Sequence, residues 1–429
     1  MVPPVLKNLI DKLSEINKDK SLSFDFLINK TAIFDDIEID EKILTLFQEG
    51  KLHDYMSKGY KDELDRMLGQ VSGRAKDSKL NDEFSDESMD VTTMDIILEI
   101  MNSDLTDSSD YMTLITKLSE LVNAFLETGR FEEILEIYNV IREQTLGGKF
   151  INEASATIEY FFHSDEFVAR FVDTLRYLGR QEREGAIRLS RALQRSVIEP
   201  LLDALAEEHF SSTRGFLLSV LTGIGSNVVP HAAKRLGDSR WHVVRNMLYL
   251  VRECNGKQEI SLIRKMIRHK NRIVCLEALK TLLHFKTSDS APALNAWLQG
   301  QDTKLRTGAI KLAGMYKVRD SVPYLIELLE KKDIFGTGAY YKIGVVRALR
   351  EIGDERAIKP FQDIINAKTI FYKDNLEELK EEIFKGLDNY PFASVRELAE
   401  SGLASKNKNI KEISEKLLLK IIISTKAED

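Results

Sequence analysis

The sequence predicts an all-α protein whose larger part, residues 165–429, is a solenoid of stacked two-helix units. Two observations carry this prediction: an apolar pattern that recurs about every 31 residues, and a composition that favours helices. Only 8 prolines and 23 glycines occur among 429 residues, of which 43% are hydrophobic and 30% charged. These proportions are typical of a globular chain built mainly from helices. The length exceeds what one compact core supports, so several domains are expected.

The first helix of each unit is marked by apolar residues at i, i+3, i+6 and i+7, which share one face of an α-helix. Consecutive copies start 30, 31, 31, 31, 31, 36 and about 37 residues apart, which predicts about seven to eight units. The starting residues are Val168, Ile198, Val229, Ile260, Ala291, Val322, Ile358 and, in a weaker copy, about Val395.

A second amphipathic helix follows in each unit after a short polar turn. Its apolar positions also repeat, because Val274 and Ala278 recur 31 residues later as Leu305 and Ala309. One such unit cannot bury both of its helix faces alone, whereas a stack of like neighbours can. Each fully buried Leu or Ile then contributes about 1.5–3 kcal/mol, most of which chain entropy offsets.

Three segments carry a family resemblance: residues 240–256, residues 303–329, and residues 344–365, which read GVVRALREIGDERAIKPFQDII. They resemble the short HEAT repeat of the phycobilisome-lyase-like and related bacterial families, and the resemblance covers about residues 165–425. It implies a right-handed, armadillo-like solenoid of a bacterial type, with the second helices lining its concave face. HEAT arrays serve many roles, so the resemblance implies a fold and no single activity.

The rest of the chain divides into three predicted regions. Residues 1–71 are expected to form a small helical N-terminal region. Residues 72–110 are predicted to be an acidic, largely disordered linker, because they are mostly polar, with MDIILEIM (94–101) as a possible docking helix. Residues 111–164 are expected to form a helical hairpin that caps the N-terminal end of the array, since solenoid ends need an atypical unit.

The net charge of −7 is distributed unevenly along the chain. Residues 1–150 hold 17 Lys and Arg against 31 Asp and Glu, a net of −14. Residues 231–320 hold 18 against 7, a net of +11. This asymmetry predicts that the basic block attracts an acidic partner.

The two cysteines, Cys254 and Cys275, are expected to be reduced and to face the core, because secreted chains usually carry more cysteines, in pairs. The N-terminus shows no signal-peptide pattern. No apolar run reaches the roughly 18 residues of a membrane span. We therefore expect a cytoplasmic protein without a membrane partner.

The sequence contains no GxxxxGK[ST] phosphate loop, no HExxH or CxxC metal-ligand set and no GxSxG nucleophile motif. No catalytic, metal-binding or cofactor-binding residue is predicted, and the protein is expected not to be an enzyme. The alternative is an enzyme on a HEAT scaffold, since bilin lyases and alkylpurine DNA glycosylases use related arrays. A glycosylase places a tryptophan and an acid around a flipped base, but Trp241 and Trp297 are two units apart, which argues against it.

Two columns of basic residues repeat with the units. Lys280, Lys311 and Arg347 occupy one position of successive second helices, at steps of 31 and 36, and Lys286 and Lys317 form another column at a step of 31. If the second helices line a concave face, these columns predict a groove for an acidic partner. The alternative is a set of solvated surface side chains.

Two longer units carry matched insertions. Ile-Phe pairs place Phe335 and Phe371 36 residues apart, with Tyr340, Tyr341 and Tyr372 nearby. Insertions in successive units map to one edge of a solenoid, so these aromatic residues are candidates for an apolar binding hot spot. The alternative is that the two phenylalanines fill gaps between units.

Together these patterns predict a non-catalytic scaffold or adaptor for protein–protein interaction. Its partner is expected to be another protein or an acidic peptide segment, including the chain's own acidic linker. A nucleic acid that binds the basic block 231–320 is the less favoured partner, because aromatic residues are not interleaved with the cations.

Overall fold

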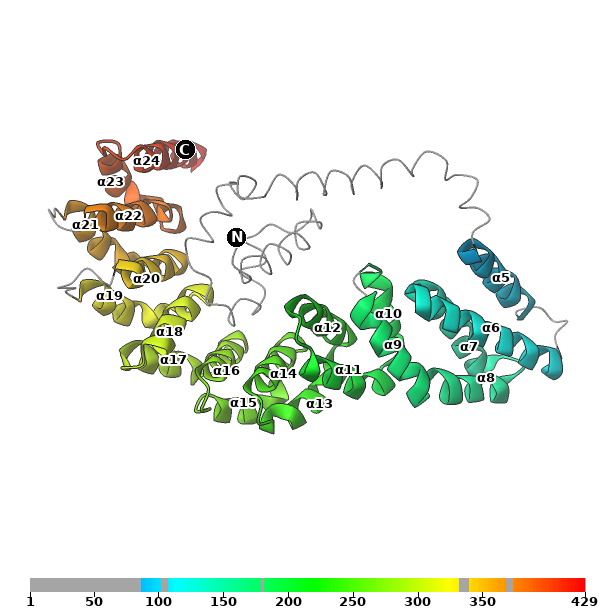
Figure 1. Ribbon diagram of the computed structural model, residues 1–429. Helices are drawn as coiled ribbons and strands as arrows, with labels where there is room; N and C mark the ends of the chain where they lie inside the picture. Colours follow the sequence, from blue (N-terminus) through cyan, green and yellow to red (C-terminus); the bar gives the residue numbers. More distant parts are fainter. Residues whose placement is uncertain (1–85, 102–106, 179–180, 332–338, 368–372, 429) are drawn as a thin grey trace, which may run out of the picture. The chain divides into compact units, whose positions relative to one another are not determined.

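The computed structural model describes residues 86–101, 107–178, 181–331, 339–367 and 373–428, and every secondary-structure element among them is a helix (Figure 1). The all-α solenoid is therefore confirmed. The described residues fall into two compact parts, which divide between Ile224 and Gly225. The predicted N-terminal helical region, residues 1–71, lies outside the described residues.

The N-terminal part contains helices in this order: α5 (Asp86–Met101), α6 (Ser108–Thr128), α7 (Phe131–Gly147), α8 (Ile151–Thr157), the π-helix η4 (Ile158–Phe162), α9 (Asp165–Tyr177), α10 (Arg183–Leu193), α11 (Arg195–Glu207) and α12 (Ser211–Ile224). Helices α7, α10 and α12 contact one another in sequence, while α9 packs on α11. The predicted hairpin within residues 111–164 corresponds to α6 and α7, with Gly129 in the left-handed region between them, at φ 74°.

The C-terminal part alternates first and second helices, with short 3₁₀ turns before many of the first ones. Its elements are η5 (Ser226–Val228), α13 (Val229–Lys234), η6 (Arg235–Gly237), α14 (Trp241–Glu253), η7 (Lys257–Glu259), α15 (Ile260–Met266), α16 (Arg272–His284), α17 (Ser290–Gln299), α18 (Thr303–Met315), η8 (Arg319–Ser321), α19 (Val322–Glu330), α20 (Ala339–Ile352), η9 (Glu355–Ala357), α21 (Ile358–Asn366), α22 (Lys373–Phe384), η10 (Leu387–Asn389), α23 (Phe392–Gly402) and α24 (Lys408–Glu428). The second helices α14, α16, α18, α20, α22 and α24 each contact the next.

The predicted first-helix pattern is the buried face of these helices. In α19 all four of its residues, Val322, Leu325, Leu328 and Leu329, are at most 3% exposed. The same apolar pattern is less deeply buried in α15, where Ile263 is fully buried but the other residues of the pattern are half-buried. Helix α15 has only 7 residues, so it presents a shorter apolar stripe to its neighbours.

A helix occupies part of the region that we expected to be a largely disordered linker, residues 72–110. Helix α5 covers residues 86–101 and buries Met94, Ile97, Leu98 and Met101, and it contacts α6 and α7. The physical reason is that these four residues recur at helical spacing within an otherwise acidic stretch. Residues 72–85 lie outside the described part of the chain.

No single helix among the described residues has the length and apolar character of a membrane span, although the bent pair Ser211–Ile224 and Ser226–Gly237 meets both criteria together.

Small residues let second helices approach closely. A methyl group added to Gly314 of α18 would lie 2.9 Å from the Cα of Ala348 in α20, which is closer than real Cβ contacts allow. At Gly344 of α20 the nearest atom, on Ile310, would be 3.9 Å away, an ordinary contact. The α18–α20 interface therefore tolerates an added methyl group at one glycine and not at the other.

We expect Gly314→Ala to lower the free energy of unfolding by about 1–3 kcal/mol, because overpacking forces the helices apart. Gly344→Ala is the matched control. It should raise stability by up to about 1 kcal/mol, the helix-propensity difference between glycine and alanine. Urea denaturation followed by circular dichroism measures both; equal midpoints for the two variants would contradict this account of the interface.

Candidate binding surface on the second helices

The first basic column follows the stacked second helices. Lys280 lies on α16, Lys311 on α18 and Arg347 on α20, and these helices contact one another in that order. Lys280 is half-buried, whereas Lys311 and Arg347 are exposed. Burial lowers the pKa of Lys280, and the carboxylate of Glu277 raises it in part. The positive charges of Arg252 and Lys311 lower this pKa again. The structure thus brings Lys280 and Lys311 within electrostatic reach of each other.

Arg347, the last residue of the column, differs from the two lysines because it forms an ion pair with a buried acid. Its Nε lies 2.9 Å from a carboxylate oxygen of Glu382 on α22, and Arg350 contacts the same oxygen at 3.3 Å. Glu382 is 5% exposed. Burial alone would raise its pKa, but the bond and charge of Arg347 hold that pKa below its usual value. At α22 the column therefore meets an acid that the sequence pattern had not indicated.

A buried ion pair joins α14 to α16 beside Lys280. Arg252, which is 3% exposed, donates from Nη1 to Glu277, which is 7% exposed. The Nε of Arg252 also lies 3.1 Å from Glu253. Burial would raise the pKa of Glu277, but the charges of Arg252 and Lys280 outweigh it and hold this pKa below the usual 4.5. Removing one partner of such a pair leaves an uncompensated buried charge.

Aromatic and cationic side chains alternate along one face of α14. The guanidinium of Arg245 lies 5.7 Å from the ring centroid of Trp241, and that of Arg252 lies 5.2 Å from the ring of Tyr249. These distances are typical of cation–π contacts. Our expectation that aromatic residues are not interleaved with the basic block is wrong on this helix. The sequence does contain a signal for this arrangement. The four residues follow one another at steps of 4, 4 and 3, and this spacing places them on one helix face.

The second basic column lies in a different place. Lys286 and Lys317 follow the ends of α16 and α18, at φ 53° and 49°, in the left-handed region. Asn255 and Gly353 occupy the equivalent positions after α14 and α20, at φ 56° and 65°. The backbone N–H of Lys317 donates to Gly314 O at 3.0 Å, and the next N–H donates to Ala313 O at 2.9 Å. This position is therefore set by helix termination, and both lysines point from turns and not from the helix face.

Most of the aromatic residues of the two insertions lie outside the described part of the chain. These residues are Phe335, Phe371 and Tyr372. Tyr340 lies in the first turn of α20, but its side chain is not among the described ones. The neighbouring Tyr341 is half-buried, and burial raises the pKa of its hydroxyl. The hot-spot hypothesis for the insertion edge therefore stays a prediction.

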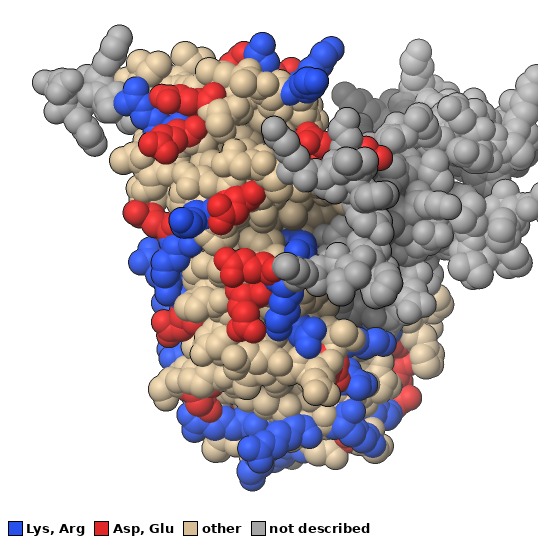
Figure 2. Space-filling view, turned by 90° about the vertical axis from the view of Figure 1, so that its left-hand side faces the viewer, with Lys and Arg blue, Asp and Glu red and all other residues tan. Residues whose placement is uncertain are grey.

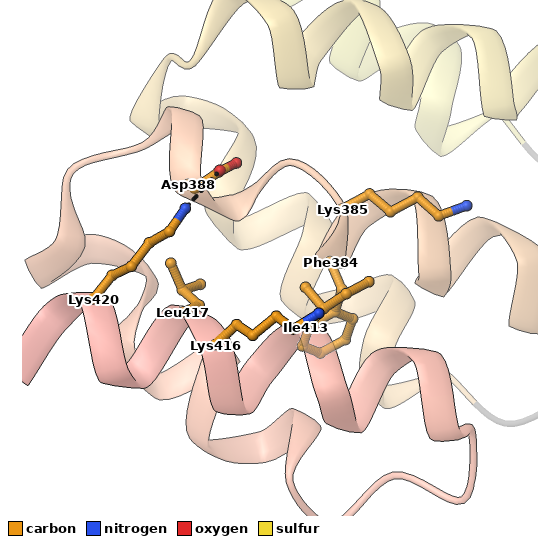
Figure 3. A pocket seen from close by; sticks show the side chains of 7 residues that line it. All are labelled: Phe384, Lys385, Asp388, Ile413, Lys416, Leu417 and Lys420. Carbon is orange, nitrogen blue, oxygen red and sulfur yellow. Dashed lines mark hydrogen bonds and ion pairs between the residues drawn. The ribbon is translucent and has the colours of Figure 1, made fainter.

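The C-terminal part also contains a small pocket between α22, η10 and α24 (Figure 3). Its volume is about 160 Å³, below the roughly 300 Å³ at which small-molecule sites begin. Lys420 closes one side through a 3.4 Å ion pair with Asp388, and Lys385 is engaged by Glu381 at 3.0 Å. The pocket shares no residue with the basic column, so it does not define the binding surface.

Metal and thiol chemistry find little support in the described residues. No three His, Cys, Asp or Glu side chains among them come together in a way that could hold a metal ion. Both cysteines are buried, and burial raises the pKa of Cys254 to about 12. A thiol with so high a pKa is a poor nucleophile at neutral pH.

Glu277→Ala should lower the free energy of unfolding by about 3–5 kcal/mol at pH 7, since Arg252 would stay buried without its main counter-charge. The pKa of Glu277 is depressed in the folded state, so its stabilisation is present above pH 4.5 and is lost as the pH falls through the folded pKa. The deficit of the variant should therefore shrink in acid.

The matched control for Glu277→Ala is the double variant Arg252→Met/Glu277→Leu, which replaces the pair by apolar groups and should cost far less. Urea denaturation at pH 7 and pH 4 measures all three proteins. A double variant as unstable as the single one would show that the charge pair is not the source of the effect.

Lys317→Gly should leave the free energy of unfolding unchanged or raise it by no more than about 1 kcal/mol, because glycine adopts positive φ without strain but has a more flexible unfolded chain. Gly353→Ala is the opposite case. It should lower stability by about 1–2 kcal/mol, since its Cβ would also lie 2.4 Å from the carbonyl oxygen of Asn389. A large loss for Lys317→Gly would mean that the lysine side chain stabilises the turn.

No protein-family model matches the sequence, and no curated protein matches it either. Several solved structures are similar, among them a phycocyanin lyase complex and importin beta. The complex of CpcE and CpcF of phycocyanin lyase from Nostoc sp. PCC7120 is 15% identical, with a TM-score of 0.28, over 57% of this chain and 94% of that one. Importin beta is 12% identical, with a TM-score of 0.39, over 81% of this chain and 54% of its own, so the match spans about half of importin beta. Such values are too low to indicate what the chain binds. A HEAT-type solenoid is consistent with the two-helix repeats described above, and the bacterial type stays a prediction.

Proposed function

We propose that the protein is a non-catalytic cytoplasmic scaffold, which binds an acidic segment of another protein along the second helices of its C-terminal part. One observation carries the proposal: Lys280 and Lys311, on adjacent helices, lie within electrostatic reach of each other. The charge of Arg252 also lowers the pKa of Lys280, but Arg252 is buried and its charge is balanced by Glu277 and Glu253. Lys280 and Lys311 are therefore the cations that we assign to the partner.

The spacing of the repeats suggests the form of the partner. Packed helices lie about 8–10 Å apart, so equivalent cations on successive second helices recur at about that step. A peptide in the polyproline II conformation rises about 3.1 Å per residue and completes a turn about every three residues. Acidic residues at every third position of such a peptide would share one face and meet successive cations of the column.

The non-catalytic role is proposed because the ionisable groups of this surface engage one another. Shifted pKa values are also a mark of catalytic sites, and an enzyme on a HEAT scaffold is the alternative. Here the shifts at Glu277 and Arg252 come from burial and from their mutual ion pair. The proposal therefore needs no substrate to explain them.

The chain's own acidic segment is a second candidate for the column. Residues 86–110 contain eight Asp and Glu and no Lys or Arg. Asp95 and Glu99 lie exposed on α5, opposite its buried apolar face. If this helix competes for the column, Asp95→Asn/Glu99→Gln should raise the affinity for an acidic peptide at low salt, where charge interactions are least screened.

The double variant Lys280→Gln/Lys311→Glu should weaken binding of a labelled twelve-residue peptide with Glu at every third position about tenfold or more. The expected cause is the loss of two charge contacts and the gain of one repulsion, together about 1.4 kcal/mol or more. Fluorescence anisotropy at 50 mM salt measures the affinity.

Lys359→Glu, which repeats the charge change of Lys311→Glu on the exposed face of α21, is the control for this experiment. It should leave the affinity unchanged, and a peptide with Gln in place of Glu should bind neither protein. Equal binding by the double variant and the wild type would remove the column from the proposal.

A further inference from the structure

A second basic surface lies away from the column, on the turns that join the first and second helices of three successive repeats. We call it the turn edge and define it as residues 234–241, 264–272 and 299–306. These ranges contain ten Lys and Arg against two Asp. They therefore hold more than half of the 18 Lys and Arg between residues 231 and 320. Figure 2 shows basic side chains gathered across the lower part of the molecule, at the level of α13 and α15 in Figure 1.

The two acids of the turn edge are already engaged. Asp238 pairs with Arg240 at 2.9 Å, and that interaction holds the pKa of Asp238 low, at about 2. Asp302 pairs with Arg272 and accepts a hydrogen bond from the backbone N–H of Leu305 at 3.1 Å. Neither carboxylate is left to balance the remaining cations of this surface.

Five cations of the turn edge have no such partner: Lys234, Lys265, Arg268, Lys270 and Lys304. All five are exposed, and none forms an ion pair with a residue that the structure describes. Three of them lie within six residues of chain: Lys265 in the last turn of α15, and Arg268 and Lys270 in the turn before α16. Like charges this close repel one another, so the surface gains nothing for folding from their concentration.

One helix end adds to the positive potential of this surface. Helix α16 begins at the turn edge after the neutral N-cap Asn271, has no acidic residue in its first turn and carries Arg272 there instead. Helix N-termini carry partial positive charge and favour anions, so this arrangement is the reverse of the one that stabilises a helix. Helix α18 also begins at the turn edge, but the carboxylate of Asp302 already caps it. An external polyanion would relieve the repulsion among the cations and the unfavourable charge at the start of α16.

The lack of exposed apolar side chains on the turn edge indicates which class of ligand this surface fits. Within the turn edge no large hydrophobic side chain is exposed, and Trp241 is half-buried beside Arg245. A folded protein partner usually needs apolar or aromatic anchors, and a membrane-docking surface needs apolar side chains that insert among the lipids. Single-stranded nucleic acid is bound largely by stacking on aromatic rings. A duplex backbone requires only positive charge, because it presents one phosphate for about every 1.7 Å of its axis.

We propose that the turn edge binds double-stranded nucleic acid through its phosphate backbone, without reading the base sequence. Lys265, Arg268, Lys270 and Lys304 supply the contacts, and the N-terminus of α16 strengthens the field around them. This surface is separate from the column of Lys280 and Lys311, and the inference goes beyond the scaffold function proposed above.

The test uses the full chain and a labelled 20-base-pair duplex of mixed sequence, in fluorescence anisotropy between 50 and 300 mM salt. With about four phosphate contacts, the logarithm of the association constant should fall with the logarithm of salt at a slope of about −3.6. Lys265→Gln/Arg268→Gln/Lys270→Gln should reduce the slope to about −1 and weaken binding at 100 mM salt about a hundredfold or more. A second duplex of unrelated sequence should bind equally well.

Lys280→Gln/Lys311→Glu is the matched control, since it changes charges on the column and should leave duplex binding within about twofold. Circular dichroism of each variant checks that the fold is retained, because all three substituted residues of the turn edge are exposed. No duplex binding at 50 mM salt, or equal binding by the triple variant, would overturn the proposal. So would binding to phosphatidylserine vesicles or to polyglutamate in the absence of binding to the duplex.

Discussion

Each repeat of the C-terminal part depends on burial of its second helix against the second helix of the next repeat. The contact is close enough that Gly314 meets the backbone of Ala348 without room for a methyl group. The same seams carry ionic contacts, Arg252 to Glu277 between α14 and α16 and Arg347 to Glu382 between α20 and α22. Because a solenoid has only neighbour-to-neighbour interfaces, the basic column is positioned by the contacts that stabilise the stack.

The sequence predicted the repeats well, because a helix that buries one face must place apolar residues at a fixed spacing. It predicted less of the surface. A step of 31 residues showed that Lys286 and Lys317 are equivalent, but it could not distinguish a helix face from the turn behind it. The equivalent residues of the neighbouring repeats, Asn255 and Gly353, did indicate a turn at this position, because asparagine and glycine are the residue types that favour positive φ. The pair of Arg252 and Glu277 was out of reach, because 25 residues separate partners that only the stacking of α14 on α16 brings together.

The positive charge of the central block serves two surfaces with different character. Along the second helices, cations lie among aromatic rings and a buried glutamate, so their positions are restricted and an incoming acidic segment would be desolvated. On the turn edge they are exposed and lie among polar turns, so an incoming polyanion would keep much of its water. The first arrangement favours a selective contact and the second a contact governed by salt.

The turns with positive φ have a consequence for how repeats of different length fit in one array. From Asn255, Lys286, Lys317 and Gly353 to the first residue of the following unit there are always five steps, at Ile260, Ala291, Val322 and Ile358. The additional residues of the longer repeat fall instead between α19 and α20, inside the repeat. The joint between neighbours thus has constant length, and the variation in length falls between the two helices of one repeat. Foreign sequence inserted between α19 and α20 would accordingly leave that joint unaltered, which makes the interior of a repeat the natural grafting point for engineered loops.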